Sequence, residues 1–239
     1  MPIYLGASEI ESGFDGSTEL QNIYIGAQEI WSNSKVINLG TGTSFDVSSI
    51  YSKYDELTAN NFFIMAANTA SGTSGTGTIS VGSGSAGSWG FQAQLVKSYN
   101  SSTGILTAYN AIKEGHDNSV RGTGSVTAVL VVKTENLINL GSVNGTISVT
   151  SYGEYRNFTN DNFLIISAAS PAHGNSYYHQ SYAYSDSGSG TSTITKSYNA
   201  TNGTLTANIK MNSTDTSGVY NYYTANEQGA VYIYLNPKV

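Results

Sequence analysis

The sequence predicts an all-β protein in which a short N-terminal hairpin segment precedes two tandem copies of one β module. Three observations support this prediction. Residues 37–40, Ile-Asn-Leu-Gly, return as residues 138–141, and residues around both copies repeat at the same distance. Helical periodicity is scarce, whereas short stretches of alternating polar and apolar residues are frequent. The chain has 26 Gly and 3 Pro, with many β-branched residues and Tyr, a composition that favours strands and turns.

The long repeat divides the chain into a leader of residues 1–36, a first module of residues 37–137 and a second module of residues 138–239. The sequence Lys-Ser-Tyr-Asn at residues 97–100 also returns, at residues 196–199, with a slightly shorter separation between the copies. The copies therefore share blocks of scaffold and differ in length between the blocks. This pattern indicates a duplicated structural module rather than a duplicated active site.

The leader contains a shorter repeat. Residues 3–10 are Ile-Tyr-Leu-Gly-Ala-Ser-Glu-Ile, and residues 23–30 are Ile-Tyr-Ile-Gly-Ala-Gln-Glu-Ile. Each copy predicts two short strands around a Gly-Ala turn, with a further turn at residues 14–17 between the copies. A two-stranded element is only marginally stable alone, so we expect the leader to dock onto its own module, a sister chain or a larger assembly. The alternative is a simple N-terminal meander on the first module.

Each module begins with the Ile-Asn-Leu-Gly strand and continues through a Tyr-containing segment, residues 51–57 or 152–158, that is either a short helix or a bulged connection. An almost wholly apolar strand follows, at residues 61–67 or 162–168. Because a strand without a polar face must be covered on both sides, we expect an oligomer partner or a further segment to cover one of them. We expect each module to be an immunoglobulin-like β-sandwich and the chain to self-associate.

A hairpin is the strongest local prediction in each module, at residues 99–105 and 198–204, because Asn opens a turn and a later Gly accepts positive φ. Each module then closes with an apolar strand, at residues 126–132 or 230–235. The copies differ most before these hairpins. Residues 69–88 are a Gly/Ser/Thr tract of low complexity, whereas residues 171–184 are rich in Tyr and His.

Composition excludes several functions. The net charge of −6 and the 10 scattered Lys and Arg argue against a nucleic-acid partner. The chain has no Cys, which excludes disulfides, thiolate catalysis and Cys-ligated metal. Neither a secretory signal nor an apolar run long enough to span a bilayer is visible, so we expect no membrane insertion.

No motif predicts a reaction centre. The chain has three His residues, His116, His173 and His179, but with so many Ser in the sequence a Ser near a His is expected by chance and does not indicate a hydrolytic triad. A third ligand for a metal held by His173 and His179 is not evident. The oxygen-rich segments at 160–162 and 186–190 are explained more simply as turns than as calcium loops. We therefore expect no catalytic residues, no cofactor and no metal, and a protein that is not an enzyme.

The Tyr-rich segments around residues 177–184 and 220–223 are the best candidates for recognition. Tyr offers a rigid contact surface with a polar tip, which suits sugars as well as proteins. The competing interpretation is an alternating strand with half of its Tyr side chains in the core. The candidate ligand-binding residues are Tyr177, Tyr178, His179, Tyr182 and Tyr184.

The leader carries the one family signal. Its paired Tyr-x-Gly-x-x-Glu-Ile segments, the second of which ends in Trp31, resemble segments of virion structural proteins of tailed bacteriophages. The low-charge composition and tandem β modules are similar to those of fibre, decoration or tail-tip proteins. The residues that would anchor the chain to the particle are Tyr4, Gly6, Glu9, Ile10, Tyr24, Gly26, Glu29, Ile30 and Trp31.

The resemblance implies a non-enzymatic structural protein of the virion, assembled in the host cytoplasm, with the two modules projecting from the particle. Its partners would be other virion proteins, further copies of the same chain and a host-surface glycan. The alternative is a carbohydrate-binding or host-adhesion module that acts through the Tyr-rich loops of the second module.

Overall fold

The computed structural model of the chain consists of β-strands and four short 3-10 helices, with no α-helix in the part that it describes. The backbone is described for residues 4–5, 8–9, 13–15, 18–20, 22–25, 28–32, 36–74, 78–80, 88–114, 118–169, 173–176, 183–185, 188–217 and 221–237, and the side chains for residues 36–73, 91–113, 118–169, 188–214 and 226–237. The predicted all-β class is confirmed, while the immunoglobulin-like form of the modules stays a prediction.

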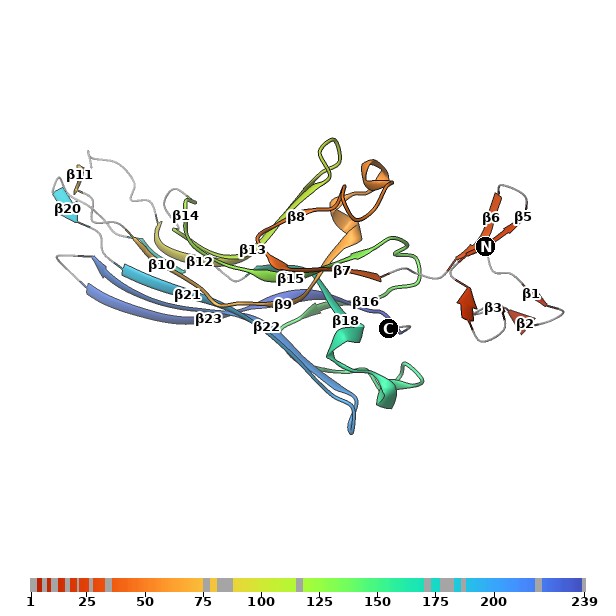
Figure 1. The fold of residues 1–239 in the computed structure, drawn as a ribbon. Coiled ribbons are helices and arrows are strands. Elements are labelled where there is room, and N and C mark those ends of the chain that lie inside the picture. The colour runs from red at the N-terminus through yellow and green to blue at the C-terminus, as the bar shows by residue number, and fades with distance from the viewer. Residues whose placement is uncertain are drawn as a thin grey trace.

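The leader forms three hairpins. Strand β1 (Tyr4–Leu5) pairs with β2 (Ser8–Glu9), β3 (Gly13–Asp15) with β4 (Thr18–Leu20), and β5 (Asn22–Ile25) with β6 (Gln28–Ser32). The two predicted strand pairs are confirmed, and a third hairpin occupies the region of the predicted turn at residues 14–17. Each hairpin is a separate two-stranded sheet, and within the described residues none of them pairs with the body. Figure 1 shows the leader beyond one end of the body.

Both halves of the body contain their elements in the same order. The first half has β7 (Val36–Gly42), β8 (Ser44–Asp46), the 3-10 helices η1 (Tyr54–Glu56) and η2 (Ala59–Asn61), β9 (Phe62–Ala67), β10 (Ala70–Ser74), β11 (Thr78–Ser80), β12 (Ser88–Asn100), β13 (Ile105–Glu114), β14 (Val120–Gly124) and β15 (Val126–Val131). The second half has β16 (Ile138–Val143), β17 (Gly145–Ser148), η3 (Tyr155–Asn157), η4 (Asn160–Asn162), β18 (Phe163–Ala169), β19 (His173–Ser176), β20 (Ala183–Ser185), β21 (Gly188–Asn199), β22 (Thr204–Ser217) and β23 (Asn221–Leu235). The long β23 takes the place of β14 and β15 together, and each Tyr-containing segment carries a 3-10 helix.

The two halves exchange strands. Strand β10 of the first half pairs with β21 of the second, and the equivalent β19 of the second half pairs with β12 of the first. The registers also correspond, because Gly72 lies opposite Gly190 in one pair and His173 opposite Phe91 in the other. Such reciprocal pairing is what an internal two-fold axis produces.

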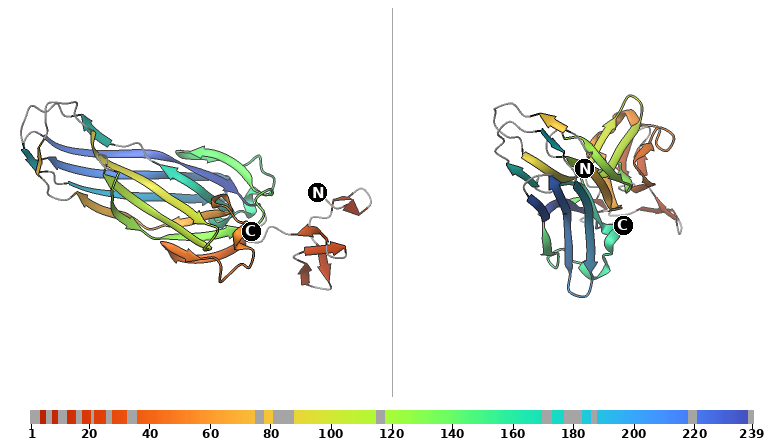
Figure 2. Two further views of the ribbon diagram at one scale, coloured as in Figure 1. Left: turned by 90° about the horizontal axis from the view of Figure 1, so that it is seen from above. Right: turned by 90° about the vertical axis from the view of Figure 1, so that its left-hand side faces the viewer.

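The equivalent strands β9 and β18 meet at this internal axis, where Ile64 pairs with Ile165. The result is one hydrogen-bonded system of 15 strands rather than two separate sheets. Figure 2 shows its long strands running along an elongated body, and in Figure 1 the β12–β13 and β21–β22 hairpins project on opposite sides. The predicted division at residues 137 and 138 falls between β15 and β16 and stays a prediction.

Alternate residues of the apolar strand β9 enter two clusters of buried side chains. Phe62 and Ile64 belong to a large core that also contains their counterparts Phe163 and Ile165. Phe63 belongs to a smaller cluster with Leu164, in which the ring of Tyr234 packs edge-on against Phe63 at 5.6 Å between centroids. Both sides of β9 are therefore covered, and the other half of the same chain provides the cover that the sequence assigned to an oligomer partner or a further segment.

The predicted hairpins at residues 99–105 and 198–204 are confirmed. Gly104 and Gly203 have φ of +69° and +64°, which residues with a Cβ rarely adopt. A Cβ at Gly203 would also lie 2.7 Å from both Thr150 and Tyr155. Each hairpin tip thus packs tightly on the Tyr-containing segment of its own half.

Candidate functional surfaces

The repeated leader residues occupy repeated positions. Tyr4 lies opposite Glu9 in the first hairpin, and Tyr24 lies opposite Glu29 in the last, so both copies have the same register for this pair. Trp31 lies opposite Ile23, and Ile30 lies on β6. Gly6, Ile10 and Gly26 lie outside the described residues. The structure therefore gives most of the candidate anchoring residues defined places on two equivalent hairpins.

The segments that differ most between the halves meet at the far end of the body. Strand β11, from the Gly/Ser/Thr tract, pairs with β20, from the Tyr-rich segment, and Tyr184 lies opposite Ile79. Figures 1 and 2 show this pair at the end of the body opposite the leader. The candidate residues Tyr177, Tyr178, His179 and Tyr182 lie outside the described residues.

The residues considered for metal or catalytic chemistry do not converge in the described structure. His173 lies on β19, while His116 and His179 lie outside the described residues. Among the described residues, no group of three or more His, Asp or Glu side chains is placed to hold a metal ion. Residues 160–162 form η4, where the Asn162 side-chain amide donates to the Asn236 carbonyl at 2.8 Å. In the described part of the chain, no helix could cross a bilayer.

Two lysines at equivalent positions are partly buried, and the sequence analysis did not single them out. Lys97 donates from Nζ to the Phe62 carbonyl at 2.7 Å, and Lys196 donates to the equivalent carbonyl of Phe163 and also to that of Asn160. Burial disfavours the ammonium ion and lowers the pKa of each lysine to about 8. The Lys-Ser-Tyr-Asn repeat marks both positions, but burial of the amines appears only in the fold.

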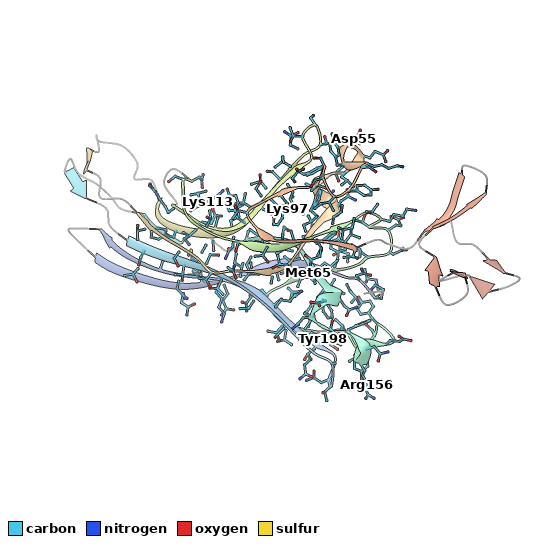
Figure 3. The ribbon with its side chains drawn as sticks, viewed as in Figure 1. Asp55, Met65, Lys97, Lys113, Arg156 and Tyr198 are labelled. Carbon is cyan, nitrogen blue, oxygen red and sulfur yellow. The ribbon has the colours of Figure 1, made fainter. Side chains whose placement is uncertain are left out.

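Two tyrosines of the same repeat fasten the 3-10 helices to the sheets. The Tyr99 hydroxyl donates to the Tyr54 carbonyl at 2.7 Å, and the Tyr198 hydroxyl donates to the Tyr155 carbonyl at 2.6 Å. Burial also raises the pKa of both phenols. The labelled Lys97 and Tyr198 lie in opposite halves of the body in Figure 3. These paired contacts hold the 3-10 helices in equivalent places in the two halves.

A buried polar contact joins the halves near the exchanged strand β10. The Asn110 side chain donates to the Asn68 carbonyl at 3.0 Å and to the Ser192 carbonyl at 2.9 Å, and it accepts a bond from the Ser192 hydroxyl at 2.6 Å. Asn110 and Ser192 are fully buried. The two bonds with Ser192 therefore cross between the halves, and the bond to Asn68 holds the residues just before β10.

Three large apolar side chains are notably exposed among the described residues: Ile50, Val120 and Tyr232. Tyr232 is the aromatic one, with 47% of its surface exposed. The sequence predicted that Tyr232 belongs to the closing strand of the second module, residues 230–235, but did not mark it as an exposed residue.

A search of protein-family models, curated proteins and solved structures found no match to this chain.

Proposed function

We propose that this chain is a non-enzymatic structural protein of a tailed-phage virion, a fibre, decoration or tail component. The leader attaches it to the particle and the body projects away from the attachment site. Its two halves would act together as one elongated projection. The Tyr-rich segment and its Gly/Ser/Thr counterpart would then stand at the end farthest from the particle.

The duplicated leader hairpin is the observation that carries this proposal. Two hairpins with the same Tyr–Glu register offer two equivalent contacts to a partner, as an attachment segment requires. Two-stranded sheets are marginally stable alone, and those of the leader pair with no described strand of the body, so an external partner is expected to stabilise them. The Tyr-x-Gly-x-x-Glu-Ile repeat links that partner to the phage particle.

Removal of residues 1–35 tests the attachment role, because it leaves the body intact from β7 onward. The shortened protein should keep its far-ultraviolet circular dichroism spectrum but should be absent from purified particles, as measured by mass spectrometry of the virions. Normal incorporation of the shortened protein would contradict the proposal.

A finer variant reverses the charge of the repeated acids, Glu9→Lys with Glu29→Lys. We expect this double variant to reduce incorporation by about tenfold or more, because each Glu lies opposite its Tyr in the proposed contact. Glu19→Lys is the matched control, since Glu19 lies on the middle hairpin, opposite Phe14, outside the repeat. Equal losses in both variants would show that leader charge, rather than the repeated hairpins, controls incorporation.

A further inference from the structure

Tyr232 lies on an open face at the centre of three paired strands. It belongs to β23, between the buried residues Val231 and Ile233, and its position is opposite Ser142 of β16 on one side and Ser167 of β18 on the other. Both serines are exposed. The sheet therefore presents an exposed phenol ring, with a serine hydroxyl at the paired position of the strand on each side.

On β16, β18 and β23 the residues that share the Tyr232 face are uncharged, and the cation of this face, Lys210, lies on the neighbouring β22, opposite Gln228. Because side chains alternate along a strand, the residues that share the face can be assigned from burial and register. On β16, β18 and β23 they are Asn139, Ser142, Leu164, Ile166, Ser167, Ala169, Asn226, Gln228, Ala230 and Tyr234. Glu227, the acid of β23, alternates with Asn226 and Gln228 and lies opposite the buried Met211.

The first half lacks this arrangement. The position equivalent to Tyr232 is Thr127, which lies opposite Thr41 and Ala66. The Thr127 hydroxyl is engaged with that of Thr41 at 2.7 Å. The first half therefore forms the same strands with Thr127 in place of an aromatic residue. Packing alone does not explain why the second half has an exposed Tyr232 at this position.

We propose that Tyr232, Ser142 and Ser167 form a binding site for an uncharged glycan. The phenol ring offers a flat apolar surface against which the C–H face of a sugar ring can stack, with the phenolic hydroxyl at its edge. The serine hydroxyls on either side both donate and accept hydrogen bonds, as sugar hydroxyls require. The absence of charge on the face of these three strands matches a neutral ligand.

A protein partner fits this face less well. Protein interfaces bury about 800 Å² per partner around a cluster of well-packed apolar or aromatic anchors. Tyr232 is the only notably exposed large apolar side chain here in the described structure, since Ile50 and Val120 belong to the first half. One stacked ring binds a sugar weakly, so repeated units along a glycan chain would raise the avidity. This inference is independent of the leader and of the proposed attachment to a particle.

An array of immobilised oligosaccharides tests the site with the full-length protein. The array should contain neutral hexose, deoxyhexose and N-acetylhexosamine glycans beside sialylated and sulfated ones. We expect binding to members of the neutral set. Tyr232→Thr, which installs the residue of the first half, should weaken that binding by about tenfold, while Tyr232→Phe should retain most of it. Ser142→Ala with Ser167→Ala should also weaken it.

Ile50→Thr is the matched control, because Ile50 is equally exposed at 47% but lies in the other half. Its binding should equal that of the unmodified protein. The proposal is overturned if the unmodified protein binds no neutral glycan, if Tyr232→Thr binds normally, or if both threonine variants lose binding equally. It is also overturned if sedimentation shows a concentration-dependent dimer that Tyr232→Thr abolishes, because the face would then join two copies.

Discussion

At the scale of single residues, the two lysines show how the duplicated scaffold places charge. Lys97 and Lys196 reach backbone carbonyls at or just before the start of β9 and β18, and within the described residues the acceptors of both amines are carbonyl oxygens rather than carboxylates. Burial is the main cause of the lowered pKa of each, and for Lys196 the nearby Asp161 opposes the shift in part. Burial of each ammonium group beside a carbonyl therefore costs the folded protein some stability.

This arrangement predicts a rise in stability with pH. Each lysine has a pKa of about 8 in the folded protein and about 10.5 when unfolded, so between these values the unfolded chain binds more protons. The free energy of unfolding should therefore increase by about 1–2 kcal/mol per lysine between pH 7.5 and 9.5. Urea titrations across this range measure it.

The double variant Lys97→Met with Lys196→Met is the control, and its stability should change much less over the same range. Measurements should stop below pH 10, because the raised pKa values of Tyr99 and Tyr198 make stability fall above that point. A flat profile for the unmodified protein would show that the two amines are not desolvated in the folded state.

At the scale of elements, β10 is held more tightly than its short length suggests. It pairs with β21, and its backbone passes so close to β14 that a Cβ at Gly122 would lie 1.8 Å from the Ser71 carbonyl oxygen. Asn110 of β13 adds hydrogen bonds to residue 68, just before β10, and to β21. Gly122, which lets β14 approach β10 closely, and the buried amide of Asn110 together hold this exchanged strand in place.

Asn110→Ile tests that joint, since Ile209 occupies the equivalent position of the second half. The variant leaves the Ser192 hydroxyl and two carbonyls without the bonds of the Asn110 amide in a buried environment. We expect it to lower the free energy of unfolding by about 2–4 kcal/mol, measured by urea denaturation. Asn212→Ala, at an exposed position of β22, should change it by less than about 0.5 kcal/mol. Similar values for the two variants would refute a special role for Asn110.

At the scale of the whole molecule, the exchanged strands make each half incomplete without the other. The second half alone would lack β10 beside β21, and its own β19 would have no β12 to pair with. The large core also draws on both halves, with Ile64 and Ile165 adjacent at the internal axis. Interlocked halves of this kind would suit the elongated projection proposed above.

The second half, residues 138–239, should therefore not fold as a monomer. We expect it to form a dimer in which two copies exchange β19, and to unfold on dilution, because the internal two-fold axis can equally relate two chains. Analytical ultracentrifugation and circular dichroism over a range of concentrations measure this. A stable folded monomer would instead support the independent modules that the repeat predicts.

The sequence by itself determined the β class, the two repeated leader hairpins, the repeated order of the main elements in the two halves and both Asn/Gly hairpins, because alternation and turn residues act over short distances. Only the tertiary structure decided that β10 and β19 cross between the halves and that the chain covers its own apolar strands. It also decided that Lys97 and Lys196 are partly buried while Tyr232 is exposed. Those features depend on pairing between residues far apart in the chain, and the same alternating strand predicts a ring in the core or a ring on the surface until its neighbours are placed.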